Sequence, residues 1–158
     1  MNALHSSDIS KYLLHNFHGI TQIEAWGEKS FFYNPDREFS RGTYFCTLKE
    51  KDGENDSASK LNRDGIYRLN FVIEKSTFLE LFHTIPNRPS KGMCIEGDYD
   101  FSKLDSLSPH PIYGWMCWVA ILNPSNESFR KIESLLSESY HLVIKKHGKK
   151  KPKTLSKQ

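Results

Sequence analysis

Four polar residues in two separate segments carry side chains that could bind or transform a small molecule. Arg68 and Asn70 stand two apart in an alternating segment, so they would share one face of a strand. His110 has a proline on each side, which stiffens the backbone around the imidazole, and Tyr113 follows shortly after it. Together such groups would suit a small anionic or carbonyl-bearing ligand, with Arg68 taking the charge and His110 exchanging a proton. We expect one concave ligand site made of Arg68, Asn70, His110 and Tyr113.

The same residues also allow a purely structural role. Arg68 could pair with Asp56 or Asp64, and His110 could bond a loop carbonyl. If His110 instead lay in a pocket with a perturbed pKa, a small-molecule enzyme using His110 would be favoured. The sequence has neither a G-x-S-x-G elbow nor an H-E-x-x-H helix. The leading interpretation is therefore a non-catalytic small-ligand or protein-interaction module.

Two other short motifs do not predict a cofactor or a metal. Gly27-Glu28-Lys29-Ser30 resembles the end of a phosphate loop, but it lacks the first glycine and the glycine directly before lysine, so a hairpin turn explains it. His15 and His18 could share a helix face, yet no cysteine or carboxylate accompanies them. We expect no cofactor and no metal.

The positive charge is concentrated at the C-terminal end of the chain. Seven of the 22 basic residues and none of the acidic ones fall in residues 145–158, which leaves 15 basic against 19 acidic residues elsewhere. We expect a single α+β domain over 1–147 and a lysine-rich disordered tail over 148–158. An acidic body argues against nucleic-acid binding by the domain, whereas the tail could act as a weak nucleic-acid-binding arm.

Hydrophobic periodicity predicts an α+β domain with a mostly antiparallel sheet of about five strands, flanked by an N-terminal helix and a long C-terminal helix. Asn123 is expected to cap the C-terminal helix. Residues 115–122 are apolar on both faces, which predicts a central strand, so Trp118→Ala should remove roughly 3 to 5 kcal/mol of stability. The expected strands cover residues 20–26, 30–33, 43–49, 66–73 and 115–122, and the expected helices cover 8–17, 77–83 and the segment after 124.

Several strings resemble a bacterial family known as domain of unknown function 6194. They are SFFYNPD (30–36), SKLNRDGIYRLNF (59–71), STFLELF (76–82), PHPIYGWMCWVAILNPS (109–125) and LLSESY (135–140). This resemblance implies no activity. The end of the chain, LLSESYHLVIKKHGKKK, is more distantly similar to the MmcQ/YjbR family, small bacterial α+β domains suggested to bind DNA. That similarity implies a sheet flanked by an N-terminal and a C-terminal helix.

No stretch approaches the roughly 20 apolar residues of a spanning helix, and the first residues lack the pattern of a signal peptide. The three cysteines are widely spaced and odd in number, which argues against a disulfide framework. We therefore expect a cytoplasmic protein that does not associate with a membrane, with a small anionic ligand or a protein as its possible partner.

Overall fold

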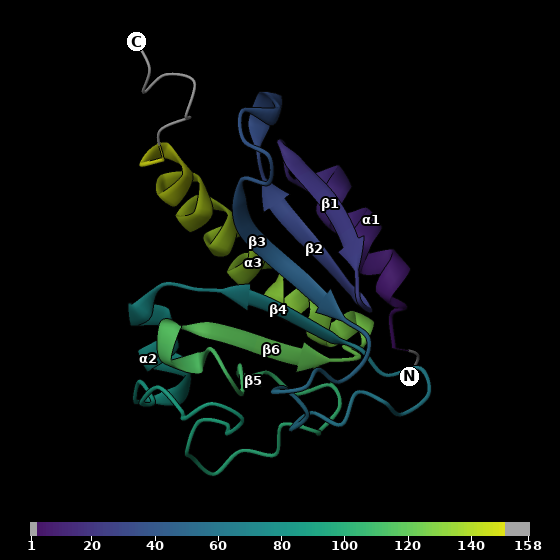
Figure 1. Ribbon diagram of the computed structural model, residues 1–158, viewed down its shortest axis with the longest axis vertical. Helices are drawn as coiled ribbons and strands as arrows, with labels where there is room; N and C mark the ends of the chain where they lie inside the picture. The colour runs from purple at the N-terminus through teal and green to yellow at the C-terminus, as the bar shows by residue number, and fades with distance from the viewer. Residues whose placement is uncertain (1–2, 151–158) are drawn as a thin grey trace.

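The computed structural model describes residues 3–150 and shows a six-stranded antiparallel sheet with helices packed on one face (Figure 1). The spatial order of the strands is β1-β2-β3-β4-β6-β5. The α+β prediction is confirmed, and the strand beyond the expected five is the two-residue β5. In chain order the strands are β1 (Ile20–Ala25), β2 (Glu28–Tyr33), β3 (Thr43–Lys49), β4 (Arg68–Val72), β5 (Ser108–Pro109) and β6 (Trp118–Leu122).

Residues 3–150 also form three α-helices: α1 (Ser6–Asn16), α2 (Lys75–Phe82) and α3 (Asn126–Gly148). Figure 1 shows α1 and α3 behind the sheet, so the short N-terminal and the long C-terminal helix cover the same face. Two 3-10 turns lie in the connections, η1 (Pro35–Arg37) and η2 (Gly114–Met116). Within residues 3–150, none of the helices has the length and apolarity needed to cross a membrane.

Side-chain alternation divides β4 between the core and the opposite face. Leu69 and Phe71 are fully buried in the core beneath the helices. Arg68 and Asn70 therefore point to the other face, as period-2 alternation requires. Helix α3 contributes Phe129 and Leu136 to the core, so the helix-facing side of the sheet is apolar while the other side carries polar groups.

The segment expected to form a central strand is shorter and lies nearer the edge. Residues 114–116 form η2, and Cys117 adopts a left-handed conformation with φ 66°, so β6 begins only at Trp118. On its outer side β6 pairs with the two-residue β5 and, through an isolated bridge at Leu122, with Leu104. Trp118 is half-buried, which corrects the expectation that its ring fills the core.

Ser125, rather than the expected Asn123, caps α3. Its hydroxyl accepts a hydrogen bond from the backbone N–H of Ser128 at 3.1 Å. Asn123 instead accepts from the N–H of Tyr67 and donates to the carbonyl of Gly65, and so ties the end of β6 to the start of β4. The first N–H groups of a helix have no acceptor within the helix, and the Ser125 hydroxyl supplies one.

The predicted boundary between domain and tail falls at the end of the described residues. Helix α3 ends at Gly148, and Lys150 donates to the carbonyl of Gly42 at 2.6 Å and lies over the ring of Phe39. The rest of the predicted tail, residues 151–158, lies outside the described residues, so its disorder stays a prediction.

Candidate functional site

A cavity of about 580 Å³ lies on the sheet face opposite α1 and α3 and is referred to below as the Arg68 cavity. Its floor comes from β3, β4 and β6, with Thr47, Lys49, Arg68 and Trp118. One wall is the loop of residues 53–56, and another is the segment of residues 110–116. These two wall segments come from loops that are far apart in the sequence, and both lie over the same face of the sheet.

Strand register explains why polar groups gather here. Glu28 of β2 pairs with Lys49 of β3, and Lys49 in turn pairs with Arg68 of β4. In the same way Thr47 pairs with Asn70. Directly opposed residues on neighbouring strands point to the same face, so the antiparallel register aligns charged and polar side chains in two rows across the sheet.

Arg68 is the centre of the polar network, and its side chain is only 1% exposed. Its Nη1 donates to Asp56 Oδ1 at 3.0 Å and to Ser59 Oγ at 2.8 Å, and its Nη2 donates to Asp56 Oδ2 at 2.5 Å. The Nε donates to Asn70 Oδ1 at 2.7 Å. A buried guanidinium needs this pairing, because an isolated charge away from water would be prohibitive.

Asn70 supports Arg68 from below and does not line the cavity. It is 1% exposed, accepts from Arg68 Nε, and donates to the hydroxyl of Thr47 at 2.9 Å. The expected ligand site thus divides into two layers. Arg68, His110 and Tyr113 border the Arg68 cavity, while Asn70 holds the guanidinium in place behind it.

His110 is locked in position by its own segment of chain. Its Nδ1 lies 3.0 Å from the backbone N of Ile112 and 3.1 Å from that of Tyr113, and it accepts from both N–H groups. The His110 backbone N–H donates to the carbonyl of Trp118. The Tyr113 ring stacks at a tilt on the imidazole, 5.1 Å between centroids, and is 50% exposed.

Burial makes His110 a neutral imidazole. The ring is 4% exposed, and this burial, together with the charge of Arg68, lowers its pKa from 6.5 to about 3. Asp56 acts in the opposite direction but is outweighed. An efficient general acid or base has a pKa near the working pH, so the direction of this perturbation argues against proton exchange by His110.

The structure also shows part of the structural role that the sequence allowed for Arg68 and His110. Arg68 pairs with Asp56, as that alternative allowed, and His110 bonds its loop, although it accepts from N–H groups rather than donating to a carbonyl. Lys49, Thr47 and Met116 line the cavity and were not expected there. The strand register would have indicated Lys49 and Thr47, since they lie opposite Arg68 and Asn70, but a register is not readable from one sequence.

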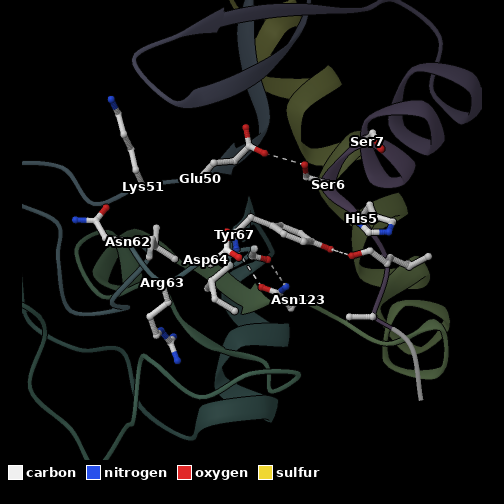
Figure 2. Close-up of a pocket in the computed structure, with 15 residues that line it drawn as sticks. His5, Ser6, Ser7, Glu50, Lys51, Asn62, Arg63, Asp64, Tyr67 and Asn123 are labelled. Atoms are coloured by element: carbon white, nitrogen blue, oxygen red, sulfur yellow. Dashed lines mark hydrogen bonds between the residues drawn. The ribbon is translucent and has the colours of Figure 1, made fainter.

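A larger cavity, about 690 Å³, lies between the N-terminal segment and the start of β4 (Figure 2). Its polar groups bond each other: Ser6 Oγ donates to Glu50, and the Tyr67 hydroxyl donates to the carbonyl of Leu4. Figure 2 shows Lys51 and Arg63 pointing away from the Tyr67 ring. Because its polar groups serve to join segments of the fold, this cavity is the weaker candidate for a ligand site.

No potential metal centre occurs in the described part of the chain, where no three His, Cys, Asp or Glu side chains cluster suitably. His15 and His18, the pair considered from the sequence, are both exposed at the end of α1. The carbonyl of His18 accepts a hydrogen bond from the hydroxyl of Tyr140, which gives this turn a structural role.

Comparison with known proteins identifies the family. Residues 4–152 match a family of unknown function, DUF6194, and because the match spans nearly the whole chain, the chain belongs to that family. No curated protein and no solved structure matches the chain. The resemblance to the MmcQ/YjbR domains and the bacterial source therefore stay predictions.

Proposed function

We propose that this member of the DUF6194 family is a non-catalytic small-ligand-binding domain and that the Arg68 cavity is its binding site. The cavity volume of about 580 Å³ falls within the roughly 300–1,000 Å³ that is usual for small-molecule sites. The observation that carries the proposal is the buried guanidinium of Arg68 at the cavity floor, fixed by the side chains of Asn70, Asp56 and Ser59. Such fixation holds a polar group in one geometry before any ligand arrives.

The lining combines fixed polar groups with adaptable apolar ones. Ile112, Met116 and Trp118 supply apolar surface beside the polar floor. Ligand sites usually have this composition, a mostly hydrophobic wall with a few placed polar groups that set the orientation of the ligand. Tyr113 and Met116 are each 50% exposed, so they stand at the mouth and can be exchanged without disturbing the core.

A binding role fits this geometry better than catalysis by His110. The imidazole is neutral over the physiological range and its Nδ1 is occupied by two backbone N–H groups. The guanidinium of Arg68 is already neutralised by Asp56. These groups can recognise a ligand but offer no base with a pKa near 7.

A thermal-shift screen of metabolites and fragments, followed by NMR mapping of the hits, tests this function. Hits should shift the backbone amides of residues 110–118, and Tyr113→Ala and Met116→Ala should each weaken their binding by about tenfold. Met93→Ala is the matched control, because Met93 is similarly exposed but lies outside the cavity. Hits that map elsewhere and bind the two mouth variants as tightly as the parent protein would contradict the proposal.

Two further expectations from the sequence belong to this proposal. All three cysteines are free, with Cys46 buried, which agrees with a cytoplasmic, reducing environment.

Nucleic-acid binding by the lysine-rich tail remains the alternative function, and most of that tail lies outside the described residues. Such binding would fall steeply with salt and would vanish on removal of residues 148–158.

A further inference from the structure

The hydrogen bonds of His110 determine which of its nitrogens carries the proton. Its Nδ1 accepts from two backbone N–H groups, at 3.0 and 3.1 Å, so a proton on Nδ1 would face two donors. A neutral imidazole has one N–H, and here it must be on Nε2. The Nε2–H group therefore faces the Arg68 side of the ring, where Arg68 Nη2 lies at 3.3 Å.

Two donors thus meet at one point without an acceptor between them. Four of the five N–H groups of Arg68 bond Asn70, Ser59 and the two oxygens of Asp56. The fifth, on Nη2, is directed at His110 Nε2, which is itself a donor. Within residues 3–150, neither the fifth N–H of Arg68 nor the Nε2–H of His110 has an acceptor, although both side chains are nearly fully buried. A buried donor left without an acceptor destabilises the fold, and an acceptor supplied by a ligand would remove that cost.

Thr47 supplies a third donor in the same cavity. Its hydroxyl accepts from Asn70 Nδ2 at 2.9 Å, so the remaining hydroxyl hydrogen must be donated elsewhere. Among the described residues the Thr47 hydroxyl makes no other hydrogen bond, and Thr47 lines the Arg68 cavity. Arg68, His110 and Thr47 therefore each have a donor that an oxygen acceptor on the ligand could bind.

One cation in the lining of the cavity has no carboxylate partner and can take a negative charge on that ligand. Arg68 is neutralised by Asp56, but Lys49, its partner across the sheet, has no carboxylate within 4.0 Å in the described part of the chain. Glu28 and Glu54 also border the cavity and give its lining one more acid than base, so a negative group is favoured only where it lies next to Lys49, and a second one would meet repulsion. One ammonium group is thus available for one carboxylate.

The apolar part of the lining favours a flat ring beside that carboxylate. Tyr113, Trp118 and Tyr44 present aromatic faces or edges to the cavity, and Met116 offers a polarisable, adaptable side chain. Aromatic rings gain from stacking on such surfaces, and methionine sulfur makes favourable contacts with aromatic ligands.

We propose that the Arg68 cavity binds a small aromatic monocarboxylate, with one carboxylate oxygen accepting from His110 Nε2–H and Arg68 Nη2–H and the other lying near Thr47 and Lys49. The ring lies against Tyr113, Met116 and Trp118. This proposal rests on the proposed function, since it names the ligand class of the same cavity.

Benzoate, benzamide and benzylamine, titrated into the ¹⁵N-labelled protein and followed by NMR, form the test. Benzoate should bind saturably with a Kd of about 1 mM, as a fragment of this size would. It should shift the His110 Nε2–H resonance and the amides of residues 110–118. Benzamide keeps one oxygen acceptor but lacks the charge and should bind at least about fivefold more weakly. Benzylamine lacks both the acceptor and the negative charge and should leave these resonances unchanged.

Two substitutions at His110 distinguish the role of Nδ1 from that of Nε2. Asn can place an acceptor near the Nδ1 position, so His110→Asn keeps the loop bonds and loses the Nε2–H donor. It should weaken benzoate at least about tenfold with little change in Tm. His110→Gln can place an N–H near the Nε2 position but loses the Nδ1 acceptor, so it should lower the Tm and bind benzoate more tightly than His110→Asn does.

The histidine ring resonances of the unsubstituted protein keep the proposal testable even if a variant fails to fold. A long-range ¹H–¹⁵N spectrum should show His110 as the Nε2–H tautomer. The Nδ1–H tautomer, or benzoate without effect on residues 110–118, would overturn the carboxylate proposal. If benzylamine or another fragment then shifted the same residues, the cavity would still be a ligand site, whereas no shift from any fragment would reject the proposed function as well.

Discussion

Arg68 and Asp56 form a bidentate ion pair beside the cavity, with Nη1–Oδ1 at 3.0 Å and Nη2–Oδ2 at 2.5 Å. Burial raises the pKa of Asp56, but the hydrogen bonds and charge of Arg68 outweigh it, so this pKa lies below its ordinary value. The pair fastens the loop of residues 53–56, one wall of the cavity, to the middle of the sheet. Arg68 is therefore a structural residue as well as part of the candidate site.

Replacing Arg68 by alanine should destabilise the fold, because the buried guanidinium holds several groups in place. The change leaves Asp56 without its counter-charge and leaves Asn70 and Ser59 without a partner. Removing one member of a buried pair loses about 3–5 kcal/mol, and we expect the lower end because Asp56 is 17% exposed. Urea unfolding measures this loss. Lys131→Ala, which breaks the exposed pair with Glu127, should change stability by less than about 1 kcal/mol.

Trp118→Ala should be milder than its position in an apolar segment suggests. The half-buried ring lines the cavity, so truncation should remove about 1–3 kcal/mol of stability and weaken ligand binding. Phe71→Ala on neighbouring β4 is the matched comparison, because Phe71 is fully buried in the core and its loss should reach about 3–5 kcal/mol. Equal losses in the two variants, measured by urea unfolding, would show that Trp118 belongs to the core.

The capping role of Ser125 predicts a specific loss at the start of α3. Ser125→Ala removes the acceptor of the Ser128 N–H and should destabilise the protein by about 1 kcal/mol. Ser134→Ala is the control, since Ser134 is an exposed residue in the interior of the same helix, where alanine is the better helix former. The two variants should shift the Tm in opposite directions, and a stabilising Ser125→Ala would exclude the cap.

The two sides of β4 show why some features could be predicted from the sequence and others could not. Period-2 alternation is a local property, so it placed Leu69 and Phe71 in the core and Arg68 on the other face. The partner of Arg68 is decided by how the loop of residues 53–56 folds over the sheet, which leaves no periodic pattern. Likewise, the apolar run of residues 115–122 does not reveal that Cys117 turns left-handed and shortens the strand.

The sequence predicted which residue types form the cavity site. It did not predict the protonation state of His110 or which side chains line the cavity and which lie behind it. Prolines around His110 indicated a fixed imidazole, which the backbone bonds to Ile112 and Tyr113 now explain. That Asn70 lies behind Arg68 rather than beside a ligand depends on the depth of the cavity. The depth of the cavity depends on how side chains pack in three dimensions, and no local sequence pattern predicts that packing.

The burial of His110 predicts how stability should depend on pH. Its folded pKa, about 3, lies below the ordinary 6.5, so the unfolded chain binds a proton that the folded protein refuses in this range. Stability from this group is complete above pH 6.5 and is lost as the pH falls toward 3, with a slope of at most about 1.4 kcal/mol per pH unit. His147, whose pKa burial also lowers, contributes in the same direction, whereas the stabilisation from Asp56 is complete above about pH 4 and is lost only below it. Urea unfolding between pH 4.5 and 8 should therefore show a shallower slope for His110→Asn than for His147→Gln, which retains the imidazole at position 110. An unchanged slope in His110→Asn would mean that folding does not lower the pKa of His110.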